Sequence, residues 1–346
     1  MDKHGVVPQV FLDIPDYFYQ QLPGLQEATI YHQKAWHNFL RRTFGWQISA
    51  LAIVSDNQDL RYFLPFVSKF RLGSTIKVSL PLSHHVGPAV SVGFSSKILS
   101  IPGPKIPFEI HDKVELPFAG YSEDNYISIL DLNPFHSLEE LFSSFSKSSI
   151  QRKISKAQNS HFEVTIGTNP DDLNAFFHLQ SLTRWRQGSP TYPQGFFRIM
   201  GEELSKGGNI QLYLLKLDNR PVSGIIFLFY GDKAIYGYGA SIDDRSIWQM
   251  GANQLVMWEA IQDAVNRGCQ QVDFGKTPKS HSSLLSYKEK WGTRSSILTY
   301  THINHKGNIL SGQRESGGMK MANWVLRHTP YPIYKRLSPL LLRQSV

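Results

Sequence analysis

The stretch IQLYLLKLDNRPVSGIIFLF, residues 210–229, consists of two apolar runs joined at Asp218-Asn219. Asp and Asn tolerate the left-handed backbone of tight turns, so this pattern predicts a β-hairpin. Residues 48–67 show the same layout around Asp56-Asn57. A third apolar run follows each hairpin, at residues 76–80 and 234–238. Helical patterning precedes each hairpin, at 32–44 before the first and at 171–186 and 196–205 before the second.

The two turns lie roughly one domain length apart. We therefore interpret the repeated layout as an internal duplication of a mixed α/β unit. The alternative is that hairpins after helices are simply common in α+β proteins. Between the two units, residues 138–158 form another helical candidate. An amphipathic helix is predicted over 252–267, with Gly268 where a helix-terminating glycine belongs.

The composition is that of a globular protein. Its 346 residues suffice for two domains with a core each, and 41% hydrophobic residues argue against a disordered chain. The 36 basic and 28 acidic residues give a net charge of +8, which favours an anionic partner. Nucleic acid, a phosphorylated sugar and an acidic membrane surface all meet that condition. No DNA-recognition motif accompanies the charge, so DNA is not expected.

Several kinds of site lack support. Cys269 is the single cysteine, which excludes an internal disulfide, and we interpret it as a buried core residue rather than a nucleophile. The histidines show no His-Glu-x-x-His pattern, so no metal is expected. Gly-x-Ser-x-Gly and Walker loops are also missing from the sequence. Without a signal-peptide pattern or an apolar run of spanning length, we expect a cytoplasmic protein.

The stretch QVDFGKTPKSHSSLLSYKEKWGTR, residues 271–294, is the most informative for function. A short buried strand is predicted to stop at Gly275, and a loop rich in Ser, Lys and His then leads to Tyr287-Lys288. A strand end covered by cations is typical of an anion-binding site. Asp273 is a conceivable base there, although a strand-end Asp commonly caps its own loop.

Two other groups of cations suit phosphate. The run 146–157 holds four cations and no acid, and on a helix Ser149, Arg152, Lys153 and Lys156 share a face. The alternative is an ordinary solvated surface. Arg184 and Arg186, around a tryptophan, can form a planar clamp on phosphate or a carboxylate. Arginines at a helix C-terminus also complement the helix dipole, so this second signal is ambiguous.

Two further segments are candidates for binding. The amides of Gly251 to Asn253, at the start of the long helix, can hold an anion, or simply begin a helix. Residues 249–253 resemble a degraded Gln-x-x-Gly-x-Gly pyrophosphate loop of acetyl-CoA-dependent acyltransferases. His84-His85 follows a predicted strand end and can line a pocket in the first unit.

The segment after residue 306 differs in kind. It combines many Leu, Tyr and Trp residues with an excess of cations: residues 313–346 hold six Lys or Arg against one acid. Such a segment can lie on an anionic bilayer surface, or pack back on the domain.

Taken together, these motifs resemble the Fem-type peptidoglycan-bridge aminoacyltransferases and the tandem GNAT-like acyltransferases of envelope polysaccharide systems. The resemblance covers roughly residues 28–305. The matching residues occur in the family's order: His32 through Trp36 to Phe44-Gly45, Leu64-Pro65, Leu72-Gly73, Ser79-Leu80-Pro81, Arg152-Lys153, Lys156-Ala157, Thr183-Arg184, Gly188, Pro190, Tyr192, Asp273-Phe274-Gly275, Tyr287-Lys288 and Trp291-Gly292.

The resemblance implies an α+β fold of two tandem GNAT-like domains, each with a mixed, mostly antiparallel sheet flanked by helices. We expect a non-catalytic first domain over 1–142, a second domain with the acyl transfer site over 143–305, and a basic amphipathic tail over 306–346. Family members with a coiled-coil arm carry it in the second domain, but 171–205 is too short for one here.

The implied function is N-acyl transfer to an amine of a cell-envelope precursor, either nucleotide- or lipid-linked. The co-substrate would be aminoacyl-tRNA or acyl-CoA, with no bound cofactor. Lys288, with Tyr287 and Asp273, would form the catalytic group. The implied substrate- and phosphate-binding residues are Arg152, Lys153, Arg184, Arg186, Tyr192, Gly251 and Asn253. Two alternatives remain open: an acyl-CoA-dependent sugar N-acetyltransferase, and a non-catalytic tandem-GNAT scaffold for exopolysaccharide assembly.

Overall fold

The structure is a computed structural model, and it describes residues 8–71, 74–94, 107–115, 119–303 and 317–345. These residues divide into two compact units: those within 8–125 together with 297–303, and 126–296 together with 317–345. These limits differ from the expected 1–142, 143–305 and 306–346. The difference arises because β7 (Ala119–Asp131) and β13 (Arg294–Ile303) each contribute residues to both units.

The first unit is built on the predicted hairpin. Strands β2 (Ile48–Val54) and β3 (Leu60–Arg71) pair antiparallel with Ile48 opposite Val67, which confirms the prediction. The order of strands is β1-β2-β3-β4-β6-β13, and β5 pairs with β3. The remaining elements of this unit are β1 (Gln9–Phe11), α1 (Asp16–Gln21), α2 (Lys34–Phe44), β4 (Ser74–Val78), β5 (Ala89–Val90) and β6 (Phe108–Ile110). Helix α2 is the predicted one, and Gly45 ends it in the left-handed conformation.

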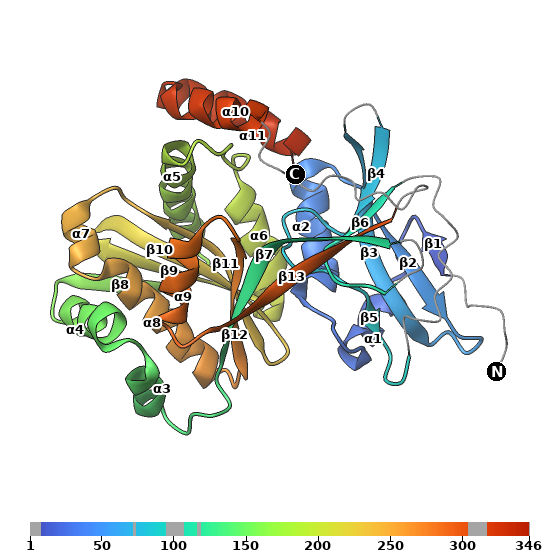
Figure 1. The fold of residues 1–346 in the computed structure, drawn as a ribbon, viewed down its shortest axis with the longest axis horizontal. Helices are drawn as coiled ribbons and strands as arrows, with labels where there is room; N and C mark the ends of the chain where they lie inside the picture. Colours follow the sequence, from blue (N-terminus) through green and yellow to red (C-terminus); the bar gives the residue numbers. More distant parts are fainter. Residues whose placement is uncertain (1–7, 72–73, 95–106, 116–118, 304–316, 346) are drawn as a thin grey trace. The chain divides into compact units, whose positions relative to one another are not determined.

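The second unit repeats the helix-then-hairpin layout, with its strands in the order β7-β12-β11-β10-β9-β8 (Figure 1). Its strands are β8 (Phe162–Gly167), β9 (Ile210–Leu217), β10 (Arg220–Tyr230), β11 (Lys233–Ser241) and β12 (Gln271–Pro278). Its helices are α3 (Leu138–Ser144), α4 (Arg152–Gln158), α5 (Pro170–Arg186), α6 (Phe196–Leu204), α7 (Arg245–Gln249), α8 (Ala252–Asn266), α9 (Ser282–Glu289), α10 (Gly317–His328) and α11 (Tyr331–Ser345).

The second hairpin turns as its sequence predicts. Asp218 and Asn219 both have positive φ, 51° and 60°, which is the backbone of a tight type I′ turn. Along the strands, alternate residues face opposite sides: Tyr213 and Phe227 pack in the core that includes α8, whereas Gly224 faces Phe176 of α5. Helices α5 and α8 therefore cover opposite faces of this sheet.

Two expectations about local structure are wrong. Strand β12 does not stop at Gly275 but runs on to Pro278, and the expected loop contains helix α9. Residues 138–158 do not form one helix, because buried Phe145 interrupts it, and a π-helical turn (Lys147–Gln151) leads into α4. The amide of Ser146 donates to the carbonyl of Lys290, which fixes this break against the segment after α9.

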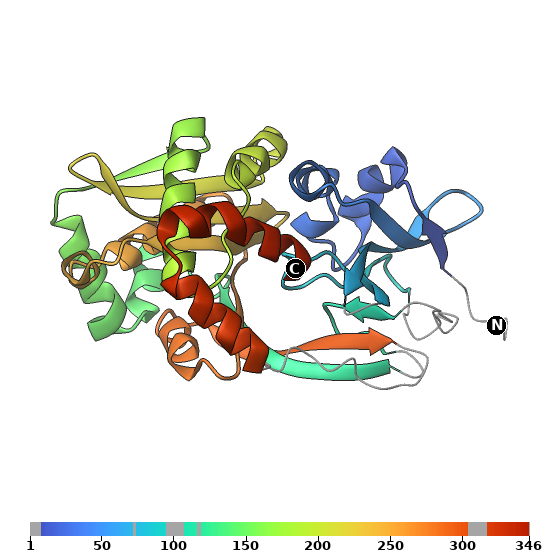
Figure 2. The same cartoon turned by 90° about the horizontal axis from the view of Figure 1, so that it is seen from above.

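The C-terminal helices α10 and α11 lie across α5 within the second unit (Figure 2). Residues 306–316 of the expected tail fall outside the described residues. Among the helices that the structure describes, none is both long and apolar enough to cross a membrane.

Candidate functional site

The candidate site forms where two parallel strands of the second unit separate. Strands β11 and β12 pair in parallel from Lys233–Gln271 to Ile235–Asp273, and α8 makes the crossover between them. Both strands continue beyond that pairing, β11 to Ser241 and β12 to Pro278. Their backbone groups past Asp273 are therefore not paired with each other, and the C-terminal ends of such strands are where α/β proteins commonly bind ligands.

Lys288 lies at this point of divergence. Gly275 has a positive φ of 75°, and its amide donates to Oδ1 of Asp273 at 2.7 Å. From α9, the Lys288 ammonium donates to the carbonyl of Gly275 at 2.6 Å and to that of Lys276 at 3.4 Å. Asp273 thus caps its own strand, as one of the two sequence readings expected. Its role as a base stays a prediction.

The surroundings of Lys288 set its charge. Only 6% of the residue is exposed, and burial lowers the pKa of its ammonium to about 8, while the nearby Asp273 carboxylate acts in the opposite direction. Lys288 therefore remains mostly charged at neutral pH. Its two carbonyl contacts use two of the three N–H donors of an ammonium, so one is left for a ligand.

Tyr287 and Trp291 hold α9 against the sheet. Trp291 is fully buried, and its ring lies 5.2 Å from that of Phe145 and 6.2 Å from that of Phe274. Burial raises the pKa of the Tyr287 hydroxyl, so this group is neutral at physiological pH and can donate a hydrogen bond. Trp291 of the Trp-Gly motif therefore packs the end of α9 against the core, and this packing positions Lys288.

Helix α8 begins beside the cations of α4. Gly251 precedes the helix with a φ of +88°, and a Cβ added there would lie 2.2 Å from the carbonyl oxygen of Lys153. Nζ of Lys156 donates to the carbonyl of Gln249 at 3.1 Å. The first amides of a helix favour anions, and the neighbouring cations strengthen that preference.

Two other predicted residues near the start of α8, Asn253 and Arg152, differ in their surroundings. Asn253 accepts a hydrogen bond from Ser223 of β10 at 2.7 Å, which anchors the first turn of α8 to the sheet. Arg152 is exposed on α4. The structure thus brings Lys153 and Gly251 together, and Arg152 and Asn253 follow or precede them in the chain; ligand binding by these four residues stays a prediction.

Arg184 and Arg186 lie at the end of α5, which covers the other face of the sheet. Arg184 donates to the carbonyl of Pro190 at 2.5 Å and stacks over the ring of Tyr192 at 4.5 Å. Tyr192 itself is buried. Arg186 donates to the carbonyl of Ser241 at 2.6 Å, which ties down the last residue of β11. These contacts fix the protein's own backbone, and anion binding by the two arginines stays a prediction.

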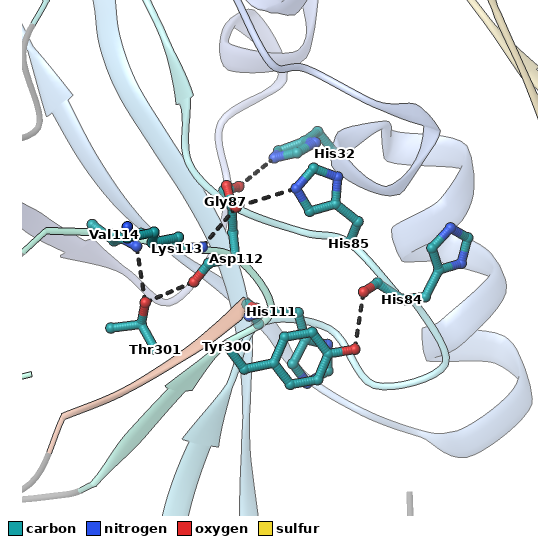
Figure 3. Close-up of polar contacts among 11 residues, drawn as sticks. His32, His84, His85, Gly87, His111, Asp112, Lys113, Val114, Tyr300 and Thr301 are labelled. Carbon is teal, nitrogen blue, oxygen red and sulfur yellow. Dashed lines mark hydrogen bonds and ion pairs between the residues drawn. The ribbon is translucent and has the colours of Figure 1, made fainter. Parts of the chain in front are cut away.

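The histidines singled out in the first unit belong to a network of polar contacts (Figure 3). The Nδ1 atom of His84 lies 3.3 Å from the Tyr31 hydroxyl oxygen, within hydrogen-bond distance. The backbone carbonyl of His84 accepts a hydrogen bond from the Tyr300 hydroxyl at 3.0 Å. His85 pairs with Asp112 at 3.2 Å. Their protein partners come from distant parts of the sequence, and substrate contact by these histidines stays a prediction.

Two histidines that the sequence did not single out complete this network. His32 contacts the carbonyl of Gly87 at 2.9 Å, and burial lowers its pKa to about 4, so it is neutral at physiological pH. His111 stacks on Tyr300 and contacts Glu109 at 3.0 Å. No functional motif marks them: Thr29 and Glu109 are near them in sequence, but Gly87 and Tyr300 are remote. Among the described residues, no group of His, Cys, Asp or Glu is arranged to hold a metal ion.

Cys269 is buried beside the second sheet, and burial raises the pKa of its thiol to about 11. A thiol with so high a pKa holds almost no thiolate at neutral pH. The interpretation of Cys269 as a core residue rather than a nucleophile agrees with this environment.

Comparison with known proteins gives consistent results. Residues 144–289 match a family described as "Acetyltransferase (GNAT) domain". A curated relative, the lipid II:glycine glycyltransferase of Staphylococcus haemolyticus (strain JCSC1435), is 22% identical over 226 residues, which are 45% of this chain and 53% of the relative. The chain thus spans about half the length of that relative.

Two solved structures share the fold over most of the chain. The crystal structure of FemX has a TM-score of 0.62 at 14% identity, with 85% of this chain and 96% of that chain covered. The structure of L-PGS from Bacillus licheniformis has a TM-score of 0.52 at 12% identity, covering 92% and 97%. Residues 144–289 thus match a GNAT acetyltransferase domain, the chain shares its fold with FemX, and the expected fold class is confirmed.

Proposed function

We propose that this protein is an N-acyltransferase that moves an aminoacyl or acyl group to an amine of a cell-envelope precursor. The observation that carries the proposal is the buried ammonium of Lys288 at the divergence of β11 and β12. The second unit holds the transfer site, and the first unit supports the substrate without taking part in the chemistry. The protein acts in the cytoplasm, where both classes of donor occur.

The chemistry requires stabilisation of one negative charge. The acceptor amine attacks the acyl carbonyl, the carbon–oxygen double bond becomes an oxyanion, and the bond to the leaving oxygen or sulfur then breaks. The remaining N–H donor of Lys288 stabilises that oxyanion, and the Tyr287 hydroxyl adds a donor beside it. The proton of the amine passes to the leaving group, either directly or through Asp273.

The donor's phosphates bind at the start of α8. The amides after Gly251 and the cations of α4 offer a positive surface beside the divergence. Asn253 keeps that turn in place, and Arg152 and Lys153 contact the phosphates. Arg184 and Arg186 retain further N–H donors and contact an anionic part of the acceptor on the α5 side, with Tyr192 supporting Arg184.

The name of the curated relative supports an aminoacyl donor and a lipid-linked acceptor, because it specifies glycine and lipid II. The second candidate function is acyl-CoA-dependent N-acetylation of an amino sugar. One feature favours it: residues 249–253 resemble a degraded pyrophosphate loop, and Gly251 leads directly into the first turn of α8. The position of Lys288 serves either donor.

The test is to measure binding of labelled acetyl-CoA and of glycyl-tRNA to the pure protein, and then transfer to lipid II, to a nucleotide-linked muropeptide and to a nucleotide-linked amino sugar. Mass spectrometry of the acceptor identifies the product. Uncharged tRNA and coenzyme A serve as controls for the acyl group. A protein that binds neither donor contradicts the proposal and supports a scaffold.

Transfer should depend on the protonation of Lys288. We expect kcat/KM to fall as the pH rises through the pKa of Lys288, about 8, because the neutral amine no longer stabilises an oxyanion. In Asp273→Asn this alkaline limb should move to lower pH, because loss of the carboxylate removes the charge that raises that pKa. The asparagine oxygen can still accept the Gly275 amide, so the strand keeps its geometry.

A pH–rate profile of the two proteins checks this prediction. Asp243→Asn, an exposed acid after β11, is the control for loss of a charge. Loss of activity at every pH in Asp273→Asn would assign Asp273 as the base instead. If the alkaline limb of Asp273→Asn stays at the same pH as in the wild type, the Asp273 carboxylate does not raise the pKa of Lys288.

A further inference from the structure

The two C-terminal helices have a packed side that belongs to the second unit. In α11 the Tyr334 hydroxyl donates to the carbonyl of Ser189 at 2.6 Å, and Ser338 accepts from the amide of Thr191 at 3.1 Å. Leu342, one further helical turn along, is buried. The spacing of these residues places them on one face of α11, and this face packs against the rest of the second unit.

A second side of the same helices is apolar and exposed. Four residues of α11 are between 45% and 63% exposed: Ile333, Leu337, Leu340 and Leu341. Their spacing of three and four residues places them in one stripe, away from the packed face. Helix α10 adds three residues of similar exposure: Met321, Trp324 and Val325. We call these seven residues the apolar stripe.

Cations accompany the apolar stripe. Arg327 at the end of α10 and Arg336 in α11 are exposed. Residues 313–346 hold six Lys or Arg and one acid, and the whole chain carries +8. Exposed Leu, Ile and Trp residues beside Arg on a helix are the composition of segments that lie in a membrane interface.

We propose that the apolar stripe of α10 and α11 docks on the surface of an anionic lipid bilayer, with Trp324 and the leucines in the interface and the arginines at the lipid phosphates. A second copy of this chain is the other possible occupant. A two-fold contact would place the arginines of one copy against those of the other, so charge favours the bilayer. Docking needs no substrate and is independent of the transfer chemistry.

The experiment is co-sedimentation of the full chain with vesicles of phosphatidylcholine and phosphatidylglycerol, and with vesicles of phosphatidylcholine alone. We expect binding to the anionic vesicles, weakened by salt. Leu337→Asn/Leu340→Asn should lower the partition coefficient by tenfold or more, to about the background. Arg327→Gln/Arg336→Gln should lower it by roughly fivefold for each cation removed.

The matched control is Val92→Asn/Ile166→Asn, which removes two aliphatic side chains that are 76% and 54% exposed elsewhere. It should bind vesicles like the wild type. Thermal melts and elution volumes verify that each variant is folded and monomeric. The proposal fails if the wild type ignores anionic vesicles, or if the leucine variant binds as well as the control. It also fails if the leucine variant dissociates a wild-type dimer, because the stripe would then be an interface between copies.

Discussion

Replacing Lys288 by Met should lower kcat/KM for acyl transfer by about 100-fold or more, the usual loss when one donor to an oxyanion is removed. Methionine keeps the length of the side chain and most of its packing inside α9 and β12. It removes the charge and the donor that reach the carbonyl of Gly275. Steady-state kinetics with the donor identified by the binding test measures the effect.

The same substitution should change stability little. The carbonyls of Gly275 and Lys276 lose a donor, but a buried charge and its desolvation cost disappear as well. Alanine is a poorer probe, because removing a side chain that is 6% exposed leaves a cavity worth about 2 kcal/mol or more. Lys290→Met removes the same charge from an exposed position nearby and is the matched control. Full activity in Lys288→Met would remove the central assignment.

A pH-dependent melt gives an independent check on Lys288. Its pKa in the folded protein, about 8, lies below 10.5, the ordinary pKa of a lysine side chain. Between those values the unfolded chain binds more protons, so Lys288 makes stability rise with pH there; below about 8 its destabilising effect is complete and constant. Lys288→Met should lack this contribution. Equal pH dependence in both proteins would mean that Lys288 is not buried as a charge.

The parts of the fold that follow from local chemistry were predictable. Asp218-Asn219 dictates a tight turn, and Gly268, with a φ of +77°, ends α8 as expected. The sequence predicts a loop where α9 lies, because this Ser-rich stretch has little helical preference, and the burial of Trp291 just after the helix is a tertiary contact. Strand β7 was not predicted, since its polar sequence carries a weak alternation.

The candidate site shows the same division. Lys288 is predicted as a site residue because a family resemblance and an unusual cluster of residues coincide at it. The divergence of β11 and β12 was not foreseeable, because a register between strands separated by a helix leaves no mark in either strand. The approach of Gly251 to Lys153 joins residues about a hundred positions apart, and the sequence named both without linking them.

That approach leads to the second large effect. Gly251→Ala should destabilise the second unit by about 2–5 kcal/mol, because a Cβ would lie 2.2 Å from the carbonyl oxygen of Lys153. This is a clash with backbone, so no side-chain rotation relieves it, and α4 must move away from α8. The positive φ of +88° adds the cost of placing alanine in the left-handed region.

Gly268→Ala separates these two contributions. Gly268 ends the same helix with a φ of +77°, but nothing lies within 4 Å of an added Cβ. It should therefore cost only about 1–2 kcal/mol, the conformational part alone. Gly251→Ala should also weaken donor binding, because displacement of α4 separates its cations from the first amides of α8, whereas Gly268→Ala should leave binding unchanged. Equal losses of melting temperature in the two variants would contradict the close approach, and unchanged donor binding in Gly251→Ala would remove the start of α8 from the phosphate site.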